Sequence, residues 1–62
     1  MKVYEILENV EVQSEVRLCY YDDERGERIE VADNESNRKK EIRYMYVEGD
    51  AIYLELEMDG EN

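Results

Sequence analysis

The chain has 62 residues and a formal net charge of −10, from 18 acidic and eight basic side chains, with one cysteine and no histidine. This length fits one small domain, and a lone thiol without histidine excludes an internal disulfide and a conventional zinc site. The charge disfavours direct binding to nucleic acid or to an anionic membrane, and it favours basic protein surfaces as partners.

The acidic residues are concentrated at the end of the chain, where residues 44–62 hold six acids and no base. Six tyrosines and a hydrophobic fraction of 42% distinguish the chain from a disordered acidic tail. No apolar run has the length of a secretory signal or a membrane-spanning helix. We therefore expect one folded domain over residues 1–58, a frayed tail over 59–62, and a soluble protein in a reducing cytoplasm, where an unpaired thiol stays reduced.

Apolar residues recur three and four positions apart in residues 3–10, as on one face of a helix of about two turns. The members of this face are Val3, Ile6, Leu7 and Val10. Alternation through Val10 and Val12 is also compatible with a strand. The helix is the interpretation that we carry forward.

Residues 16–21 and 28–32 alternate apolar and polar side chains, which predicts two strands joined by the charged turn 22–26. A four-residue loop sets Asp22 opposite Glu27. The same register pairs Tyr20 with Ile29 and Leu18 with Val31, and it places the apolar residues of both strands on one side. This agreement between loop length and alternation favours a β-hairpin.

The stretch from Asp33 to Glu41 contains no apolar residue. It predicts a polar connection, with a helical turn capped by Asn34 or Ser36. The connection also holds a short basic cluster, Arg38, Lys39 and Lys40. We interpret this cluster as part of a solvated loop that offsets local acid, because a nucleic-acid contact needs a broader basic face.

Two β-rich runs between Ile42 and Met58 flank Glu48-Gly49-Asp50, which predicts a second hairpin. A two-residue type II′ turn at Gly49 and Asp50 gives the facing pairs Val47 and Ile52, Met45 and Leu54, Arg43 and Leu56. The opposite side then carries Ile42, Tyr44 and Tyr46 against Tyr53, Glu55 and Glu57. A three-residue loop is the alternative, and it leaves Met45 and Val47 outside the core.

Two hairpins and one helix predict an α+β fold. The simplest assembly is a four-stranded antiparallel sheet with one short N-terminal helix across it.

The sequence offers no constellation for catalysis or for a cofactor. Cys19 has no histidine to activate it, so we interpret it as a small residue on a half-covered strand, with a redox or intermolecular thiol as the alternative. The acidic turn departs from a calcium loop, because Gly26 stands at position five and strands flank it. Close carboxylate pairs are unavoidable at this acid content, and no glycine-rich phosphate loop is present. We expect no enzyme, no metal and no cofactor.

The tyrosines and carboxylates of the second hairpin form the candidate partner-binding site. Tyrosine offers a large contact area with few rotatable bonds, and it is enriched in interfaces. The simpler interpretation is a sheet surface stabilised by cross-strand pairs and kept soluble by its acids. A charge of −10 exceeds what solubility requires of this length. The predicted binding residues are Tyr44, Tyr46, Glu48, Asp50, Tyr53, Glu55, Glu57 and Asp59.

The opening MKVYEILENVEVQSEVRLCYYDDERGERI and the closing EIRYMYVEGDAIYLELE resemble small acidic proteins encoded by temperate phages and mobile elements of Gram-positive bacteria. Several such proteins inhibit host defence, notably anti-CRISPR proteins that occupy the DNA-binding surfaces of Cas nucleases. The resemblance is one of overall style, without a specific motif, and it assigns no residue a role. It implies a non-enzymatic inhibitor that covers a basic, nucleic-acid-binding surface by nucleic-acid mimicry.

The alternative function belongs to a different class. It is a small homodimeric structural or accessory phage module, in which the tyrosine-bearing face or an edge strand pairs with its own copy and no basic partner is needed. Light scattering on Tyr46→Glu and Tyr53→Glu variants addresses this alternative.

Overall fold

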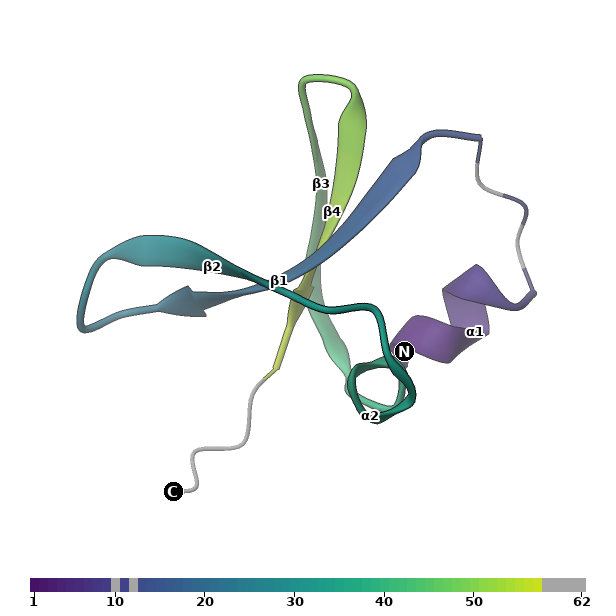
Figure 1. Ribbon diagram of the computed structural model, residues 1–62, viewed down its shortest axis with the longest axis horizontal. Coiled ribbons are helices and arrows are strands. Elements are labelled where there is room, and N and C mark those ends of the chain that lie inside the picture. Colours follow the sequence, from purple (N-terminus) through teal and green to yellow (C-terminus); the bar gives the residue numbers. More distant parts are fainter. Residues whose placement is uncertain (10, 12, 58–62) are drawn as a thin grey trace.

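The computed structural model describes residues 1–9, 11 and 13–57, so the tail expected over 59–62 lies outside it. The described chain forms a four-stranded sheet and two short helices, one more than the single N-terminal helix of the predicted fold (Figure 1). The elements are α1 Val3–Leu7, β1 Glu15–Asp22, β2 Glu27–Val31, α2 Glu35–Arg38, β3 Ile42–Glu48 and β4 Ala51–Leu56. Neither described helix is long or apolar enough to cross a membrane.

Both expected hairpins are present, but the sheet that they form is mixed. The strand order is β2-β1-β4-β3, and β1 pairs parallel to β4, so the expectation of an antiparallel sheet throughout is wrong. The reason is which strand of the second hairpin lies beside β1. β4 buries Ala51, Leu54 and Leu56, whereas β3 has no fully buried side chain. Hydrophobic burial therefore favours β4 in the central position.

The first hairpin has the register that its loop length predicts. Tyr20 faces Ile29, and Leu18 faces Val31. Gly26 ends the turn with a φ of 67°, a conformation that glycine adopts without the steric cost of a Cβ atom.

The second hairpin confirms the two-residue turn. Val47 faces Ile52, and Met45 faces Leu54. Gly49 has a φ of 63°, while no non-glycine residue of the described chain has a positive φ. Positive φ at only the first central residue is the pattern of a type II′ turn, as the sequence predicts.

The start of β3 departs from the predicted register. A β-bulge between Ile42 and Tyr44 places Ile42, and not Arg43, opposite Leu56. The predicted position of Ile42, on the side of Tyr44 and Tyr46, is therefore wrong. The bulge turns the Ile42 side chain toward the core and leaves Arg43 exposed, which is favourable for an aliphatic and a charged side chain respectively.

Helix α1 completes the core on the apolar side of the sheet. Val3 is fully buried there and packs with Leu18, Leu54 and Leu56. Burial of a side chain of this size stabilises the fold by roughly 1.5–3 kcal/mol. The helix ends at Leu7, earlier than the predicted span of 3–10, whose last residue lies outside the described part. Partly buried side chains around this core are Leu7, Val16, Val31, Ile42 and Ile52.

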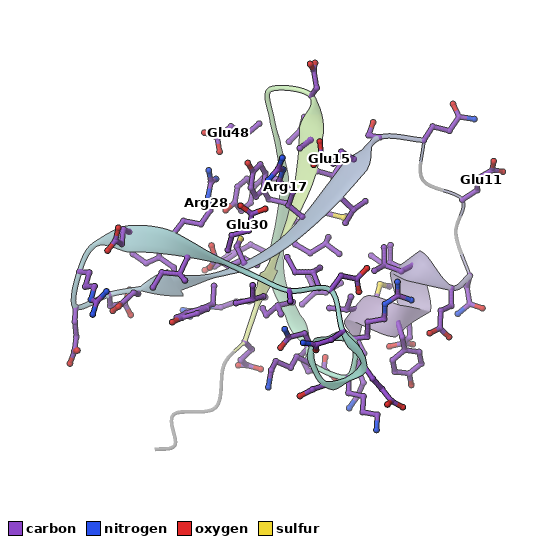
Figure 2. All side chains as sticks on the ribbon, in the orientation of Figure 1. Glu11, Glu15, Arg17, Arg28, Glu30 and Glu48 are labelled. Atoms are coloured by element: carbon purple, nitrogen blue, oxygen red, sulfur yellow. The ribbon has the colours of Figure 1, made fainter. Side chains whose placement is uncertain are left out.

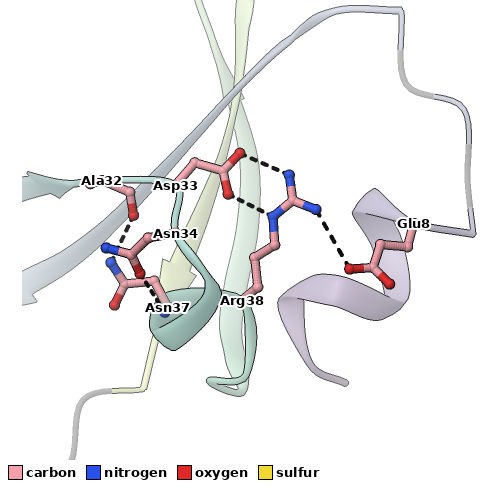
Figure 3. A network of polar contacts seen from close by, with 6 residues as sticks. All are labelled: Glu8, Ala32, Asp33, Asn34, Asn37 and Arg38. Carbon is pink, nitrogen blue, oxygen red and sulfur yellow. Dashed lines mark hydrogen bonds and ion pairs between the residues drawn. The ribbon is translucent and has the colours of Figure 1, made fainter.

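Helix α2 lies in the polar connection, and Asn34 caps it as predicted, accepting a hydrogen bond from the Asn37 amide at 2.8 Å. Arg38 donates to both carboxylate oxygens of Asp33, at 2.7 and 3.0 Å, and lies 3.6 Å from the Glu8 carboxylate (Figure 3). Hydrogen bonding to Arg38 lowers the pKa of Asp33. One residue of the basic cluster thus offsets local acid and joins the two helices.

The amino terminus lies along the start of β3. The Ile42 amide donates to the Met1 carbonyl at 2.7 Å, and the Val3 amide donates to the Lys40 carbonyl at 3.1 Å. The terminal amine forms an ion pair with Glu41 at 2.8 Å. The first residues of the chain therefore close the beginning of this edge of the sheet.

Candidate partner-binding face

The face of the sheet opposite the core carries most of the predicted binding residues. Cross-strand pairing defines it: Tyr46 lies opposite Tyr53, and Tyr53 lies beside Arg17. Helix α1 packs on the other side, where Val3 and Leu7 join the core. We call this surface the outer face. Its side chains are Glu15, Arg17, Cys19, Tyr21, Arg28, Glu30, Tyr44, Tyr46, Glu48, Ala51, Tyr53 and Glu55.

Two stacked tyrosines form the centre of the outer face. The ring centroids of Tyr46 and Tyr53 are 5.7 Å apart, with an interplanar angle of 9°. The guanidinium carbon of Arg28 lies 4.0 Å from the centroid of Tyr53 and 6.0 Å from that of Tyr46. Because the face of an aromatic ring attracts a cation, the stacked pair is a platform that holds a guanidinium group.

A carboxylate completes the surroundings of Arg28. Arg28 belongs to β2 and Glu48 to β3, the two edge strands, yet their side chains form an ion pair (Figure 2). The Tyr46 hydroxyl and the Glu48 carboxylate raise the pKa of Arg28. An aromatic surface and a carboxylate therefore hold the same guanidinium.

The second arginine of the face lies between two glutamates. Arg17 approaches Glu15 at 2.8 Å and donates to Glu30 at 2.6 Å. The hydrogen bond to Glu30 is the main reason why the pKa of Arg17 is raised. Tyr53 links this group to the Arg28 site, because Tyr53 lies beside Arg17 and its ring also contacts Arg28. The outer face thus holds two guanidinium groups, each beside carboxylates.

Cys19 belongs to the outer face but is fully buried. Its sulfur lies 3.7 Å from the Tyr46 hydroxyl and donates to the Leu54 carbonyl at 3.8 Å. Burial raises the pKa of the thiol. A raised pKa lowers the thiolate fraction at neutral pH, and the thiolate is the reactive form. These contacts favour the interpretation of Cys19 as a small packing residue.

The predicted binding residues fall into four groups. Those on the outer face are Tyr44, Tyr46, Glu48, Tyr53 and Glu55. Asp50 is exposed in the turn between β3 and β4. Glu57 follows β4 at the other end of the strand, in a shallow groove with Lys2 and Lys40, and so lies away from this face. Asp59 is outside the described residues.

Sequence reasoning missed Glu15, Arg17, Arg28 and Glu30. The alternation of β1 does place Arg17 on the side of Cys19, so part of the signal was present. The missing information was that β4 pairs with β1, which brings Arg17 beside Tyr53. These four residues add two positive and two negative charges, so they leave the net charge of the outer face unchanged and give it guanidinium groups among its carboxylates.

No set of three His, Cys, Asp or Glu side chains within residues 1–9, 11 and 13–57 is arranged to hold a metal ion. A groove between the two helices has basic, acidic and aromatic walls, including Lys2, Tyr4, Glu35 and Lys39, and this mixture selects no ligand class.

Comparison of the chain with protein-family models, with curated proteins and with solved structures finds no match.

Proposed function

We propose that the protein is a non-enzymatic binding protein that inhibits a nucleic-acid-binding protein of a bacterial host by covering its basic surface. The observation that carries this proposal is the position of Arg28 on the Tyr46–Tyr53 pair, beside Glu48. The chain's own guanidinium occupies this platform. The same groups can hold an arginine of a partner, through cation–π attraction and charge-assisted hydrogen bonds.

The charge of the chain supports the same function. Surfaces that bind nucleic acid present arginine and lysine to phosphates. The outer face presents glutamates at spacings fixed by strand pairing, and Glu55 lies directly opposite Tyr44. A net charge of −10 also speeds the encounter with a positive partner. A Cas nuclease, as for anti-CRISPR proteins, is one partner of this class, and the bacterial cytoplasm is where the two would meet.

The test compares two immobilised variants of equal net charge. One is Glu30→Gln/Glu48→Gln/Glu55→Gln, on the outer face. The other is Asp23→Asn/Glu24→Gln/Glu27→Gln, in and beside the β1–β2 turn, where all three side chains are exposed. Both are used with the wild type to capture proteins from bacterial lysates. Captured proteins are eluted with NaCl and identified by mass.

We expect the wild type and the turn variant to capture nucleic-acid-binding proteins. The outer-face variant should not capture them. These proteins elute by about 0.5 M NaCl, where the Debye length falls to about 4 Å, and duplex DNA displaces them. Equal capture by the two variants, or capture that survives this salt and excess DNA, contradicts the proposal.

Substitution of Arg28 tests the platform itself. Arg28→Gln removes the cation that occupies the Tyr46–Tyr53 pair and frees Glu48. Binding to a captured basic protein should tighten by about tenfold or less, as expected for one exposed charge–aromatic site. Isothermal titration calorimetry measures the change. Weaker binding by a variant with an unchanged circular dichroism spectrum would show that Arg28 is itself a contact and not a competitor.

A further inference from the structure

The two edge strands of the sheet differ in how well they are protected from pairing with a strand of another chain. β2 is short and carries Arg28 and Glu30, charges that discourage pairing with another strand. β3 carries adjacent exposed side chains of a different kind: Tyr44 is 56% exposed, Met45 60% and Val47 72%. Within the described chain β3 pairs with β4 on one side and with no strand on the other beyond its first residue.

Hairpin geometry identifies the backbone groups at this edge. In a hairpin with a two-residue turn, the residues that flank the turn, Glu48 and Ala51, exchange hydrogen bonds. Alternation then directs the amide and carbonyl groups of Met45 and Val47 away from β4. These groups lie at the free edge beside their own exposed apolar side chains. The start of the edge is closed, because Met1 accepts the hydrogen bond of Ile42.

We infer that β3 pairs antiparallel with β3 of a second copy of this chain, extending the sheet across a two-fold axis. Pairing centred on Met45 sets the two Met45 residues opposite each other, where their outward amide and carbonyl groups exchange hydrogen bonds. On the outer face it places Tyr44 beside Tyr46 of the second copy, which continues the tyrosine row that Tyr53 begins.

The charges of β3 are self-complementary in this arrangement. Arg43 stands near the start of the strand and Glu48 at its end. Antiparallel pairing brings Arg43 of each copy toward Glu48 and Asp50 of the other, where opposite charges favour this register over a parallel one. A second copy is therefore the occupant that both the apolar side chains and the charges of this edge fit.

Salt separates this association from the binding to a basic partner. Two chains of −10 repel each other at long range, and added salt screens that repulsion. Dimerisation through β3 should therefore strengthen between about 0.05 and 0.5 M NaCl, over the range in which attraction to a basic protein weakens. Sedimentation equilibrium over protein concentrations up to about 1 mM measures the dimer fraction.

Three variants locate the interface. Met45→Pro removes an outward amide while leaving the ladder to β4, and Val47→Lys adds a charge at the edge. Tyr4→Lys adds the same charge on α1, where the side chain it replaces is 38% exposed. Circular dichroism checks that each variant is folded. If Met45→Pro is unfolded, the result for Val47→Lys is the one that tests the interface.

The inference expects a wild-type dimer that strengthens with salt, an affinity lowered at least about tenfold in Val47→Lys and Met45→Pro, and an unchanged dimer in Tyr4→Lys. A wild type that stays monomeric throughout overturns it. So does a dimer that weakens with salt, or one that all three variants affect equally.

Discussion

The two faces of the sheet come from alternate residues of the same strands, yet different forces hold their side chains. On the core face Leu18, Leu54 and Val3 are removed from water, a contribution that depends on apolar area and little on salt. On the outer face Arg28 is held by aromatic rings and a carboxylate at the surface, where such interactions are weaker and are screened by salt. The charged groups suited to binding should therefore contribute less to folding than the buried side chains of the core, so the two roles can be tested separately.

The largest expected effect concerns the core face. Leu54→Ala leaves a cavity under α1 and should lower the free energy of unfolding by roughly 2–5 kcal/mol, which is most of the stability of so small a domain. Urea unfolding followed by circular dichroism measures the change. Val47→Ala, at a side chain 72% exposed on the same hairpin, is the matched control and should change stability by about 0.5 kcal/mol or less. Equal effects of the two would place the core elsewhere.

The next effect concerns the stacked tyrosines of the outer face. A double-mutant cycle with Tyr46→Ala and Tyr53→Ala should give a coupling energy of about 0.5–1.5 kcal/mol, as expected for an aromatic pair at this separation. Urea unfolding of the wild type, the two single variants and the double variant gives the four free energies that the cycle needs. A coupling indistinguishable from zero would mean that the rings do not stabilise each other in solution.

The pH dependence of stability should reveal the buried thiol. Burial raises the pKa of Cys19 above its ordinary value of 9.0, and burial likewise raises that of Tyr46 above 10.0. The unfolded chain therefore loses these protons first as pH rises, and it binds fewer protons than the native state. Stability should be fully present below pH 9 and fall above it. Denaturation midpoints from pH 7 to 11 measure the fall, and Cys19→Ala should lessen its slope; an identical slope in that variant would exclude the thiol as a cause.

The smallest effect lies at the helices. Arg38 holds the pKa of Asp33 below its ordinary value of 3.8. Carbon-detected NMR titration should find the Asp33 carboxyl titrating below that value, and Arg38→Gln should raise its pKa. Lys39→Gln, one residue further along, is the control and should leave the titration unchanged. A normal pKa in the wild type would show that the pair does not persist in solution.

Local sequence patterns predicted the pairing within each hairpin, because loop length and side-chain alternation depend only on residues that are close in the sequence. Leu18 with Val31 and Val47 with Ile52 follow from them directly. The strand order of the sheet could not be predicted in this way. It depends on whether β3 or β4 lies beside β1, and β4 lies there because this position buries Leu54 and Leu56. The bulge at Ile42 could not be predicted from alternation either, because it results from packing of Ile42 against the core.

The candidate site was predicted in part. Tyr46, Tyr53 and Glu48 could be grouped from one hairpin, because they share a face in its register. Arg28 could not be added, because its contact with Glu48 spans the sheet from one edge to the other and depends on twist. Whether Glu57 joined the face depended on where β4 ends.

The most direct test of the outer face as a guanidinium-binding surface is an amide-detected NMR titration of the ¹⁵N-labelled protein with a hexa-arginine peptide. The proposed function predicts that the largest shift changes occur at Tyr46, Glu48 and Tyr53, and that Glu30→Gln/Glu48→Gln/Glu55→Gln suppresses them. The most acidic turn, Asp22 to Glu24, offers carboxylates without an aromatic platform. Changes concentrated at that turn and unaffected by the triple substitution would contradict the proposal.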